Sequence, residues 1–494
     1  MIKTNPERSR DGRSRADRPP ESLAPNRPAN PQKARLGRRL GPSTQSLILA
    51  LVVLLSMPFA YHFGWKFLGG AAVDYPSVHY AANLAFNEEK SPYGSSAFDQ
   101  ATMELGRKVH PYFYPPPSLL AFWPLAKMEF RTGHAALLLA SHLAYLSAIW
   151  LILARLTPLP NDQLRRVLLL VCSLAYFFSF DPSMVTLAIG QINLIVLAFV
   201  CWAILGMRRS GPAWQIALPL SIAILLKTYP ILLLAPLVFH RRFQAVLLTC
   251  LFFGGFTAFA AAVLPAEVWA GWFREVMPQG GYANNAIAAA AHWNQNINGF
   301  VSRLFLPNEF SDAPLAFAVL AKPLATLLAL AVVAITALSS FQAGRASAAD
   351  RSVTPSETAS YLLMIFLVAP LSWEHHLVYV LPAAVLGICL LLERALSGKE
   401  AFVILAALCL MAWPVPIADP ALKHGWWTLL ISAKFYAVAA LWVFFVRRLC
   451  PGRSRPWPER LGAQAEIEDQ PIERKLPDRS REVGSRRKPR WSLH

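Results

Sequence analysis

Long hydrophobic runs recur along the whole 494-residue chain, and they constrain its fold more than any other feature. Several reach about 18 residues, the length that an α-helix needs to cross the hydrocarbon core of a membrane. The runs are continuous, whereas the strands of a membrane β-barrel alternate apolar and polar residues in segments of about ten. Only 15% of the residues are charged. The sequence therefore predicts an all-α, polytopic membrane protein.

The positive charge of the chain, a net +18, is concentrated in two tails. Residues 1–43 carry eleven Lys or Arg against four Asp or Glu, and residues 447–494 carry thirteen against seven. The positive-inside rule places both tails in the cytoplasm, which favours membrane retention over nucleic-acid binding as their role. Attraction to anionic lipid headgroups is a second explanation. We therefore predict a plasma (inner) membrane protein with a disordered tail at 1–43, a transmembrane domain at 44–446 and a basic tail at 447–494.

The hydrophobic runs and the basic clusters together predict about twelve spans. The run 213–239 is too long for one span and breaks at Lys227, while Asp181-Pro182 is expected to supply an outward turn between two helices. Residues 115–128 are too few to cross a membrane, so we expect a re-entrant or half-inserted segment. The predicted helices cover 46–65, 134–154, 166–181, 183–206, 213–239 as two pieces, 244–264, 314–340, 357–371, 376–393, 401–417 and 426–446.

Two long polar segments, 71–114 and 265–300, are predicted to face the outside. Asp74 opens the first of them, directly after the first hydrophobic run, so it is expected at the membrane–water boundary. A carboxylate at that depth is desolvated on one side and reaches polar substrate on the other, which suits a general base. The alternative is that Asp74 only marks the end of a helix.

Three polar residues interrupt apolar runs on the same predicted side. Gln191 and Asn193 lie in a span near its outer third, where they either bond neighbouring helices or contact substrate. Lys227 stands at the predicted helix break, so its cation either extends to the interface or lines a cavity. We favour the cavity, because a break near the outer face opens space between the helices.

The segment 265–300 combines tryptophans with neutral amides, among them Trp293, Asn294 and Gln295, and Arg303 follows it. Aromatic rings cover the apolar face of a sugar and amides bond its hydroxyl groups, so this composition suits a carbohydrate. An interfacial aromatic belt would explain the tryptophans but not the amides.

The last polar cluster is Trp373-Glu374-His375-His376, between two predicted helices. Two histidines and a carboxylate can bind a metal ion, but adjacent histidines on one helix point about 100° apart and rarely chelate one ion. Interfacial structure and the binding of an anionic headgroup are the other two interpretations.

These residues, taken in order, resemble glycosyltransferase family 87, of the GT-C class, whose members look like polyprenyl-phosphate-mannose-dependent mannosyltransferases. The matching residues are Asp74, Ser91-Pro92-Tyr93, Tyr114-Pro115-Pro116, Trp123-Pro124-Leu125-Ala126, Gly190-Gln191, Asn193, Lys227, Pro230, Asn294-Gln295-Asn296, Ser372-Trp373 and His375-His376. The resemblance implies a GT-C-like bundle with two long extracytoplasmic loops. It also implies that Asp74 is the catalytic carboxylate.

The resemblance further implies inverting transfer of a sugar, most simply mannose, from a polyprenyl-phosphate donor to a lipid or glycan acceptor on the extracytoplasmic face. We expect no cofactor, because no pair of clustered carboxylates suggests a divalent metal site on that face. The rival function is a transporter or flippase for lipids or lipid-linked sugars. The assignments are Asp74 as general base, Lys227, Arg303, His375 and His376 as ligands of the donor phosphate, and Tyr75, Tyr114, Gln191, Asn193, Trp293, Asn294, Gln295 and Trp373 as ligands of sugar or acceptor.

Overall fold

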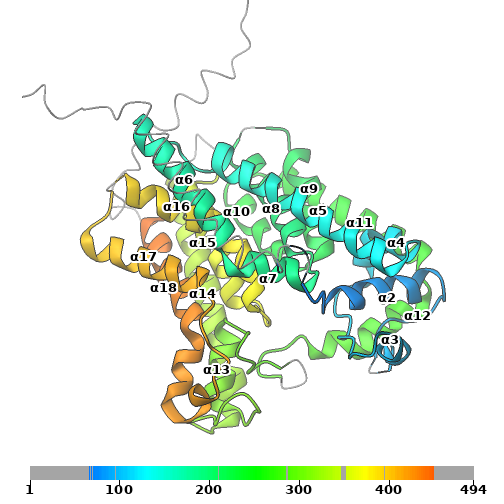
Figure 1. Ribbon diagram of the computed structural model, residues 1–494. Helices are drawn as coiled ribbons and strands as arrows, with labels where there is room; N and C mark the ends of the chain where they lie inside the picture. The colour runs from blue at the N-terminus through cyan, green and yellow to red at the C-terminus, as the bar shows by residue number, and fades with distance from the viewer. Residues whose placement is uncertain are drawn as a thin grey trace, which may run out of the picture.

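The computed structural model describes residues 66, 68, 70–94, 96–209, 211–284, 288–346, 352–393 and 395–449. Regular structure within these ranges is helical, apart from one isolated bridge between Asn294 and Trp373 (Figure 1). The predicted first helix at 46–65 and nearly all of both tails lie outside the described residues. The prediction of an all-helical membrane protein is confirmed for the described part of the chain.

Five helices of the described part are long and apolar enough to cross a membrane, or six if one bent pair counts as a single span. They are Phe130–Leu156, Phe243–Val263, Ala318–Arg345, Glu374–Leu392 and Gly425–Leu449, and the bent pair is Gln163–Ser179 with Asp181–Ile189. Other predicted spans form shorter apolar helices, because prolines and polar breaks interrupt them. The total of twelve spans stays a prediction.

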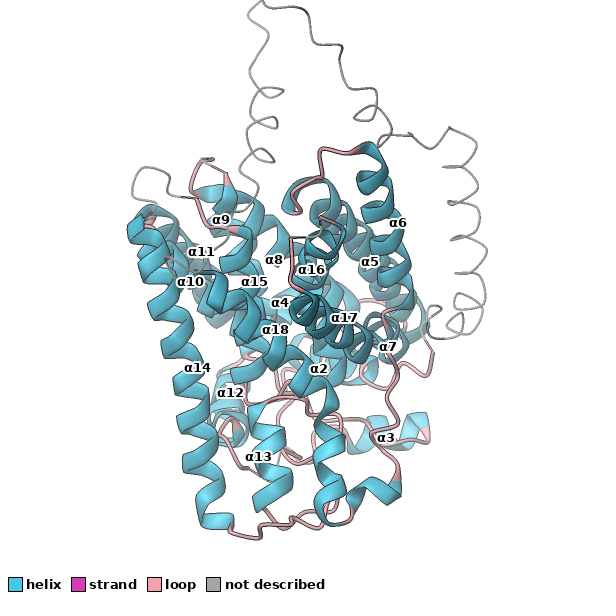
Figure 2. Ribbon diagram, turned by 90° about the vertical axis from the view of Figure 1, so that its left-hand side faces the viewer, coloured by secondary structure: helices cyan, strands magenta, loops and turns pink. Residues whose placement is uncertain are grey.

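The helices pack into one bundle, and different helices lie toward its two ends. Within the bundle α8 packs against α5 and α9, α9 against α11, and α15 against α14, α16 and α18. Figures 1 and 2 show α3, α12 and α13 toward one end, and α9 and the start of α6 toward the other. The bounds are α2(Tyr75–Phe86), α3(Asp99–Leu105), α4(Leu119–Ala126), α5(Phe130–Leu151), α6(Gln163–Ser179), α7(Asp181–Ile189), α8(Asn193–Arg208), α9(Trp214–Leu226), α10(Leu234–Phe239), α11(Phe243–Val263), α12(Ala266–Gly271), α13(Ile297–Phe305), α14(Ala318–Ala346), α15(Pro355–Val368), α16(Leu381–Leu392), α17(Gly398–Ala412) and α18(Ala433–Leu449).

The predicted turn at Asp181-Pro182 is wrong. The axis bends there by only 42° between α6 and α7, and α7 begins at Asp181 with proline in its first turn, a position that needs no backbone N–H. The chain reverses instead at Gly190–Ile192, where Gly190 has a φ of +74°. Glycine reaches this left-handed conformation without steric cost, so it ends α7 and lets α8 return.

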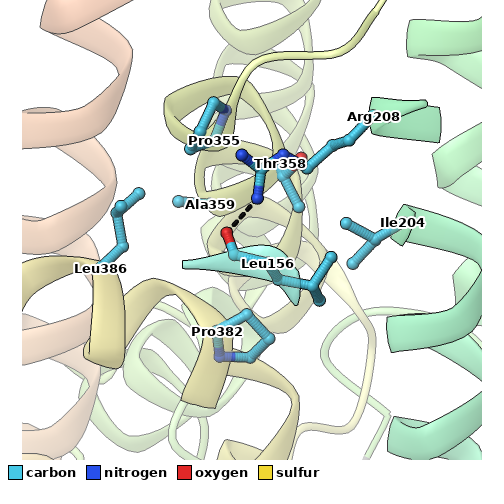
Figure 3. A pocket seen from close by; sticks show the side chains of 8 residues that line it. All are labelled: Leu156, Ile204, Arg208, Pro355, Thr358, Ala359, Pro382 and Leu386. Carbon is cyan, nitrogen blue, oxygen red and sulfur yellow. Dashed lines mark hydrogen bonds between the residues drawn. The ribbon is translucent and has the colours of Figure 1, made fainter. Parts of the chain in front are cut away.

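The return of α8 brings two basic segments together, as the positive-inside argument required. Arg208, the last residue of α8, donates a hydrogen bond to the carbonyl of Leu156, at the end of the helical stretch that continues α5. Figure 3 shows this contact beside a cavity of about 20 Å³, room for about one water molecule. The cavity also touches α15 through Thr358 and α16 through Pro382.

The predicted break at Lys227 is confirmed. α9 ends at Leu226, a 3-10 segment covers Tyr229–Leu233, and α10 follows. Residues 115–128 contain only the 3-10 turn Pro116–Ser118 and the eight-residue helix α4, which packs against α2. An eight-residue helix is about 12 Å long, too short to span a membrane. The segments predicted as long loops are helical in part, since they contain α2, α3, α12 and the start of α13.

Candidate active site

Side chains from five distant segments line a cavity of about 230 Å³. The segments are the start of α2, the stretch before α4, the turn between α7 and α8, the break after α9 and the turn before α16. Each is a helix end or a break, where polar side chains can leave the apolar packing of the bundle. The lining residues are Asp74, Ser77, Val78, His110, Pro111, Phe113, Tyr114, Pro115, Gln191, Lys227, Thr228, Tyr229, Leu371, Trp373 and His376.

Backbone contacts with the end of α7 place Asp74 at one end of this cavity. The amides of Ala72 and Asp74 donate to the carbonyls of Ala188 and Ile189, at 2.7 and 2.8 Å. A Cβ atom on Gly190 would lie 2.7 Å from Cβ of Tyr75, so only glycine permits this approach. Although Asp74 directly precedes α2, its side chain makes no capping hydrogen bond to that helix. The carboxylate is therefore directed to the cavity and not to helix capping.

A short hydrogen-bond chain joins the carboxylate to an aromatic ring. The Nε2 atom of Gln191 donates to Oδ2 of Asp74 at 2.9 Å, and the hydroxyl of Tyr114 donates to Oε1 of Gln191 at 2.8 Å. The three side chains come from the start of α2, the turn after α7 and the stretch before α4. They form one connected polar wall of the cavity.

Burial raises the pKa of Asp74 above its ordinary value. The hydrogen bond from Gln191 and the positive potentials of His110 and Lys227 act in the opposite direction and offset part of this rise. A carboxylate with a raised pKa is a better proton acceptor at neutral pH, provided that it stays ionised. The surroundings of Asp74 therefore suit a general base.

Lys227 adds a buried amino group to the lining of the same cavity. The side chain of Lys227 is 6% exposed, and its Nζ lies 2.9 Å from Nε2 of His376. Nζ also lies 5.5 Å from the ring centre of Tyr114 and 6.0 Å from that of Tyr229. No carboxylate of the described residues lies within ion-pair distance of Lys227. A buried cation in this state is costly unless an anion joins it, so this part of the cavity is suited to an anionic ligand.

His376 is held in place by the turn that carries it. The backbone N–H of Trp373 donates to Nδ1 of His376 at 3.2 Å, and the rings of the two residues are parallel, with centres 6.4 Å apart. The imidazole therefore presents Nε2 to Lys227. The sequence assigns Lys227 and His376 to the donor phosphate and Trp373 to sugar or acceptor, and the structure places all three in the lining of one cavity.

Three residues predicted to contact substrate lie behind the cavity wall. The hydroxyl of Tyr75 lies 3.1 Å from Nδ1 of His79, away from the cavity, and Tyr75 is fully buried. Asn193 accepts a hydrogen bond from the hydroxyl of Tyr379 at 2.9 Å. His375 is buried, and its carbonyl accepts from Thr186 at 3.2 Å. Their observed contacts are with other parts of the bundle.

The predicted carbohydrate-binding amides form a separate buried cluster. The backbone N–H of Gln295 donates to the carbonyl of Ser372 at 2.9 Å, and the backbone N–H of Ser372 donates to Oδ1 of Asn294 at 3.0 Å. Trp293 packs against Trp373 with ring centres 6.3 Å apart. None of the three amide or indole side chains of 293–295 lines the cavity. They brace the turn that carries Trp373 and His376.

Arg303, on α13, lies in the same cluster and is also away from the cavity. It is fully buried, and its guanidinium donates to the carbonyls of Ala291 and Asn294, at 2.7 and 2.9 Å, and to the hydroxyl of Ser432 at 2.8 Å. These bonds tie an irregular segment to the start of α18. Irregular backbone buried inside a protein needs such partners, which explains the amides and the arginine together.

Five polar or aromatic side chains that line the cavity were not predicted as site residues: Ser77, His110, Phe113, Thr228 and Tyr229. His110 and Phe113 belong to the aromatic and proline-rich stretch that ends at Tyr114, and Thr228 and Tyr229 directly follow Lys227. Proximity to residues already singled out was the available signal. Ser77 had no signal, because its place depends on the packing of α2.

Comparison with known proteins shows which family the chain belongs to. The chain matches the family described as Glycosyltransferase family 87 over residues 112–370, more than half of its length. The chain belongs to glycosyltransferase family 87. The match confirms the family and the enzyme class, a membrane glycosyltransferase, that the motifs predicted. The matched range contains Tyr114, Gln191 and Lys227, whereas Asp74 lies before it and His376 after it.

The glycosyltransferase is also similar to characterised enzymes over most of its length. It is 26% identical over 445 residues, 85% of this chain and 95% of the relative, to a polyprenol-phosphate-mannose-dependent alpha-(1-2)-phosphatidylinositol mannoside mannosyltransferase of Mycobacterium tuberculosis. It is 25% identical over 375 residues, 72% of this chain and 79% of the relative, to a protein of the same description from Mycolicibacterium smegmatis. No solved structure matches the chain.

The glycosyltransferase offers no group of three or more His, Cys, Asp or Glu within its described ranges that could hold a metal ion. In the predicted cluster at 373–376, Glu374 is ion-paired with the buried Lys434, and His376 faces Lys227. The potential metal ligands at this turn therefore contact different side chains. Metal-independent transfer stays a prediction.

Proposed function

We propose that this glycosyltransferase moves a mannosyl group from a polyprenyl-phosphate donor to a lipid or glycan acceptor, with inversion, on the extracytoplasmic face of the plasma membrane. The activities named for its relatives support mannose as the sugar, polyprenol phosphate as the carrier and a phosphatidylinositol mannoside as the nearest acceptor class. The observation that carries the proposal is the cavity itself. It holds a half-buried carboxylate and a buried cation without an acidic partner, which are the groups that such a transfer needs.

The chemistry is a single displacement at the anomeric carbon. Asp74 accepts the proton of the acceptor hydroxyl as that oxygen forms a bond to the anomeric carbon. The bond between that carbon and the phosphate oxygen breaks, and its electron pair leaves with the phosphate. Because one displacement occurs at the carbon, the anomeric configuration inverts. A general base of this kind contributes roughly 10²–10⁴-fold to the rate.

Lys227 and His376 are the groups that we assign to the leaving phosphate. Nζ of Lys227 lies 2.9 Å from Nε2 of His376, so a phosphate oxygen beside this pair would contact both. The negative charge on the phosphate grows as the bond breaks, and a fixed cation stabilises that growth. Trp373, parallel to the imidazole, is the aromatic surface that we assign to a sugar ring. Arg303 and His375 support this arrangement from outside the cavity and are not assigned to the phosphate.

We assign the orientation in the membrane from the basic residues near the ends of three helices. α8, α14 and α18 end in Arg208, Arg345 and Arg447-Arg448. The end of α14 meets α10 at the carbonyl of Phe239, and Arg242 donates to the carbonyl of Gly206 near the end of α8. The positive-inside rule assigns this end to the cytoplasm, with both termini there and about twelve spans in total.

The decisive experiment incubates the purified protein with radiolabelled polyprenyl-phosphate-mannose and a lipid extract that contains phosphatidylinositol mannosides. We expect a labelled glycolipid from the native protein and its near absence from Asp74→Asn, which keeps the size of the side chain but cannot accept the proton. Asp99→Asn, which changes an exposed carboxylate at the start of α3, is the matched control and should keep full transfer.

Two outcomes would contradict the proposal. Full transfer by Asp74→Asn would show that another group is the base. Tight donor binding without any product, combined with movement of the intact donor across vesicles, would favour a transporter instead. Orientation is tested separately with single cysteines in a cysteine-free background. A cysteine at Ser96 should react with a membrane-impermeant reagent in intact cells, and one at Ser14 should not.

A further inference from the structure

The side chain of Gln191 has a fixed orientation in the cavity wall. Its Oε1 accepts from the hydroxyl of Tyr114 at 2.8 Å and from the backbone N–H of Ile192 at 3.3 Å. Its Nε2 donates to Oδ2 of Asp74 at 2.9 Å. A flipped amide would face two donors with its NH₂ group and would direct its carbonyl oxygen at the carboxylate. The two donors to Oε1 therefore select the orientation in which Gln191 donates to Asp74.

We propose that Gln191 and Tyr114 are positioning residues that hold the Asp74 carboxylate ready to accept the proton of the acceptor, and that they are not ligands of the sugar. The inference rests on the proposed function, in which Asp74 is the base. With Oδ2 occupied by Gln191, Oδ1 is the oxygen left for the acceptor hydroxyl. The hydrogen bonds among the described residues give Oδ1 no partner.

Tyr114 is itself anchored on three sides, which makes it a stable reference for the amide. Its carbonyl accepts from the hydroxyl of Tyr93 at 2.7 Å. Its ring lies 5.3 Å from that of Tyr112, and Nζ of Lys227 lies 5.5 Å from its centre. The hydroxyl that orients Gln191 therefore belongs to a ring that cannot turn freely. A sugar would be limited to the second N–H of Gln191 and the lone pairs of the Tyr114 hydroxyl, because the other hydrogen-bonding groups of the two side chains are occupied.

The proposed role has a consequence that sugar binding does not share. A hydrogen bond from Gln191 stabilises the ionised form of Asp74, so its removal should make the carboxylate harder to ionise. Transfer should then require a higher pH. A hydrogen bond to a charged group is strong enough to move the acid limb of the rate profile by roughly one to two pH units. Loss of a sugar ligand would raise the KM of the donor without moving that limb.

The test measures transfer against pH for Gln191→Met and Tyr114→Phe. Both should shift the acid limb of kcat to higher pH. The shift should be larger for Gln191→Met, because Tyr114→Phe removes only the hydroxyl and leaves the N–H of Ile192 as a donor to Oε1 of Gln191. The KM for polyprenyl-phosphate-mannose should change less than about threefold, whereas the loss of a charged contact to the donor would raise it roughly tenfold to a hundredfold. Tyr112→Phe is the matched control. It removes a neighbouring buried hydroxyl, one that bonds Ser118, and should leave the acid limb where it is.

Besides Tyr114, two titratable groups face Asp74 across the cavity, His110 and Lys227. The profiles are therefore repeated with His110→Asn in every protein, so that a shift that persists belongs to Asp74. An unmoved limb with a raised donor KM would overturn the inference and return Gln191 to sugar binding. Equal shifts in Tyr112→Phe would show a general structural effect and would also overturn it. Failure of the proposed function gives a different result, namely full transfer by Asp74→Asn.

Discussion

Replacing Lys227 with methionine should weaken donor binding without destabilising the protein. The lysine is buried and has no ion-pair partner among the described residues, so its desolvation is not repaid until an anion binds. Methionine has a similar length and no charge, which removes that cost. Loss of a charge-assisted contact to the phosphate costs roughly 1.5–3 kcal/mol, or about tenfold to a hundredfold in donor affinity. The unfolding temperature should stay level or rise.

A second buried lysine provides the matched control. Lys434 is fully buried and ion-paired with Glu374, whose side chain is 19% exposed. Lys434→Met leaves that carboxylate without its partner, so we expect destabilisation that approaches about 3 kcal/mol, at the low end for a broken buried pair because Glu374 is partly solvated. The two variants have the same substitution in the same protein, and they should change stability in opposite directions.

The assay pairs thermal unfolding in detergent with the Kd of the donor, measured in the absence of acceptor. If Lys227→Met lost stability as much as Lys434→Met while the donor Kd stayed unchanged, Lys227 would be structural and the phosphate site would lie elsewhere. Lys227→Arg tests the geometry. It keeps the charge but places it on a larger planar group, so it should recover only part of the affinity.

Three further results are expected. Transfer should fall on the acid side at a higher pH than an ordinary aspartate would give, because burial raises the pKa of Asp74 and only its ionised form accepts a proton; a pH–rate profile measures this, and a limb in the ordinary range would contradict it. Gly190→Ala should reduce transfer at least tenfold, because alanine at this positive φ brings roughly 1–3 kcal/mol of backbone strain and a 2.7 Å contact with Tyr75. Gly398→Ala is the control and should not change transfer, because a Cβ atom there meets open space. Glu357→Gln should lower the unfolding temperature, because Glu357 is fully buried and meets His240 at 2.9 Å; unchanged stability would refute this.

The helical pattern and the selection of Asp74 and Lys227, which line one cavity, were predictable, and for physical reasons. Burying a carboxylate or a lysine beside long apolar runs costs free energy, so such residues are rare there and indicate a functional site. The break at Lys227 was visible because the run is too long for one span and proline follows. The turn at Asp181 was misplaced, because proline in the first turn of a helix is as favourable as proline in a loop.

The cluster around Asn294 shows what the sequence could not tell. Amides bond sugars and backbone carbonyls equally well, and only the fold decides which partner is near. Here the amide of Asn294 donates to the carbonyl of Ala289 and accepts from the backbone N–H of Ser372. Arg303, predicted to bind the donor phosphate, donates instead to three oxygens of the protein. The residue type alone does not distinguish these two uses of a guanidinium.

The cavity draws its walls from segments that stretch from Asp74 to His376. During synthesis on the ribosome the chain therefore carries its carboxylate and its lysine long before the imidazole that completes the pair with Lys227 has been made. An unfinished chain has no complete site, and no fragment shorter than about three hundred residues contains one. Activity thus reports on the correct insertion of the whole stretch from Asp74 to His376, so we expect a chain shortened within it to be inactive.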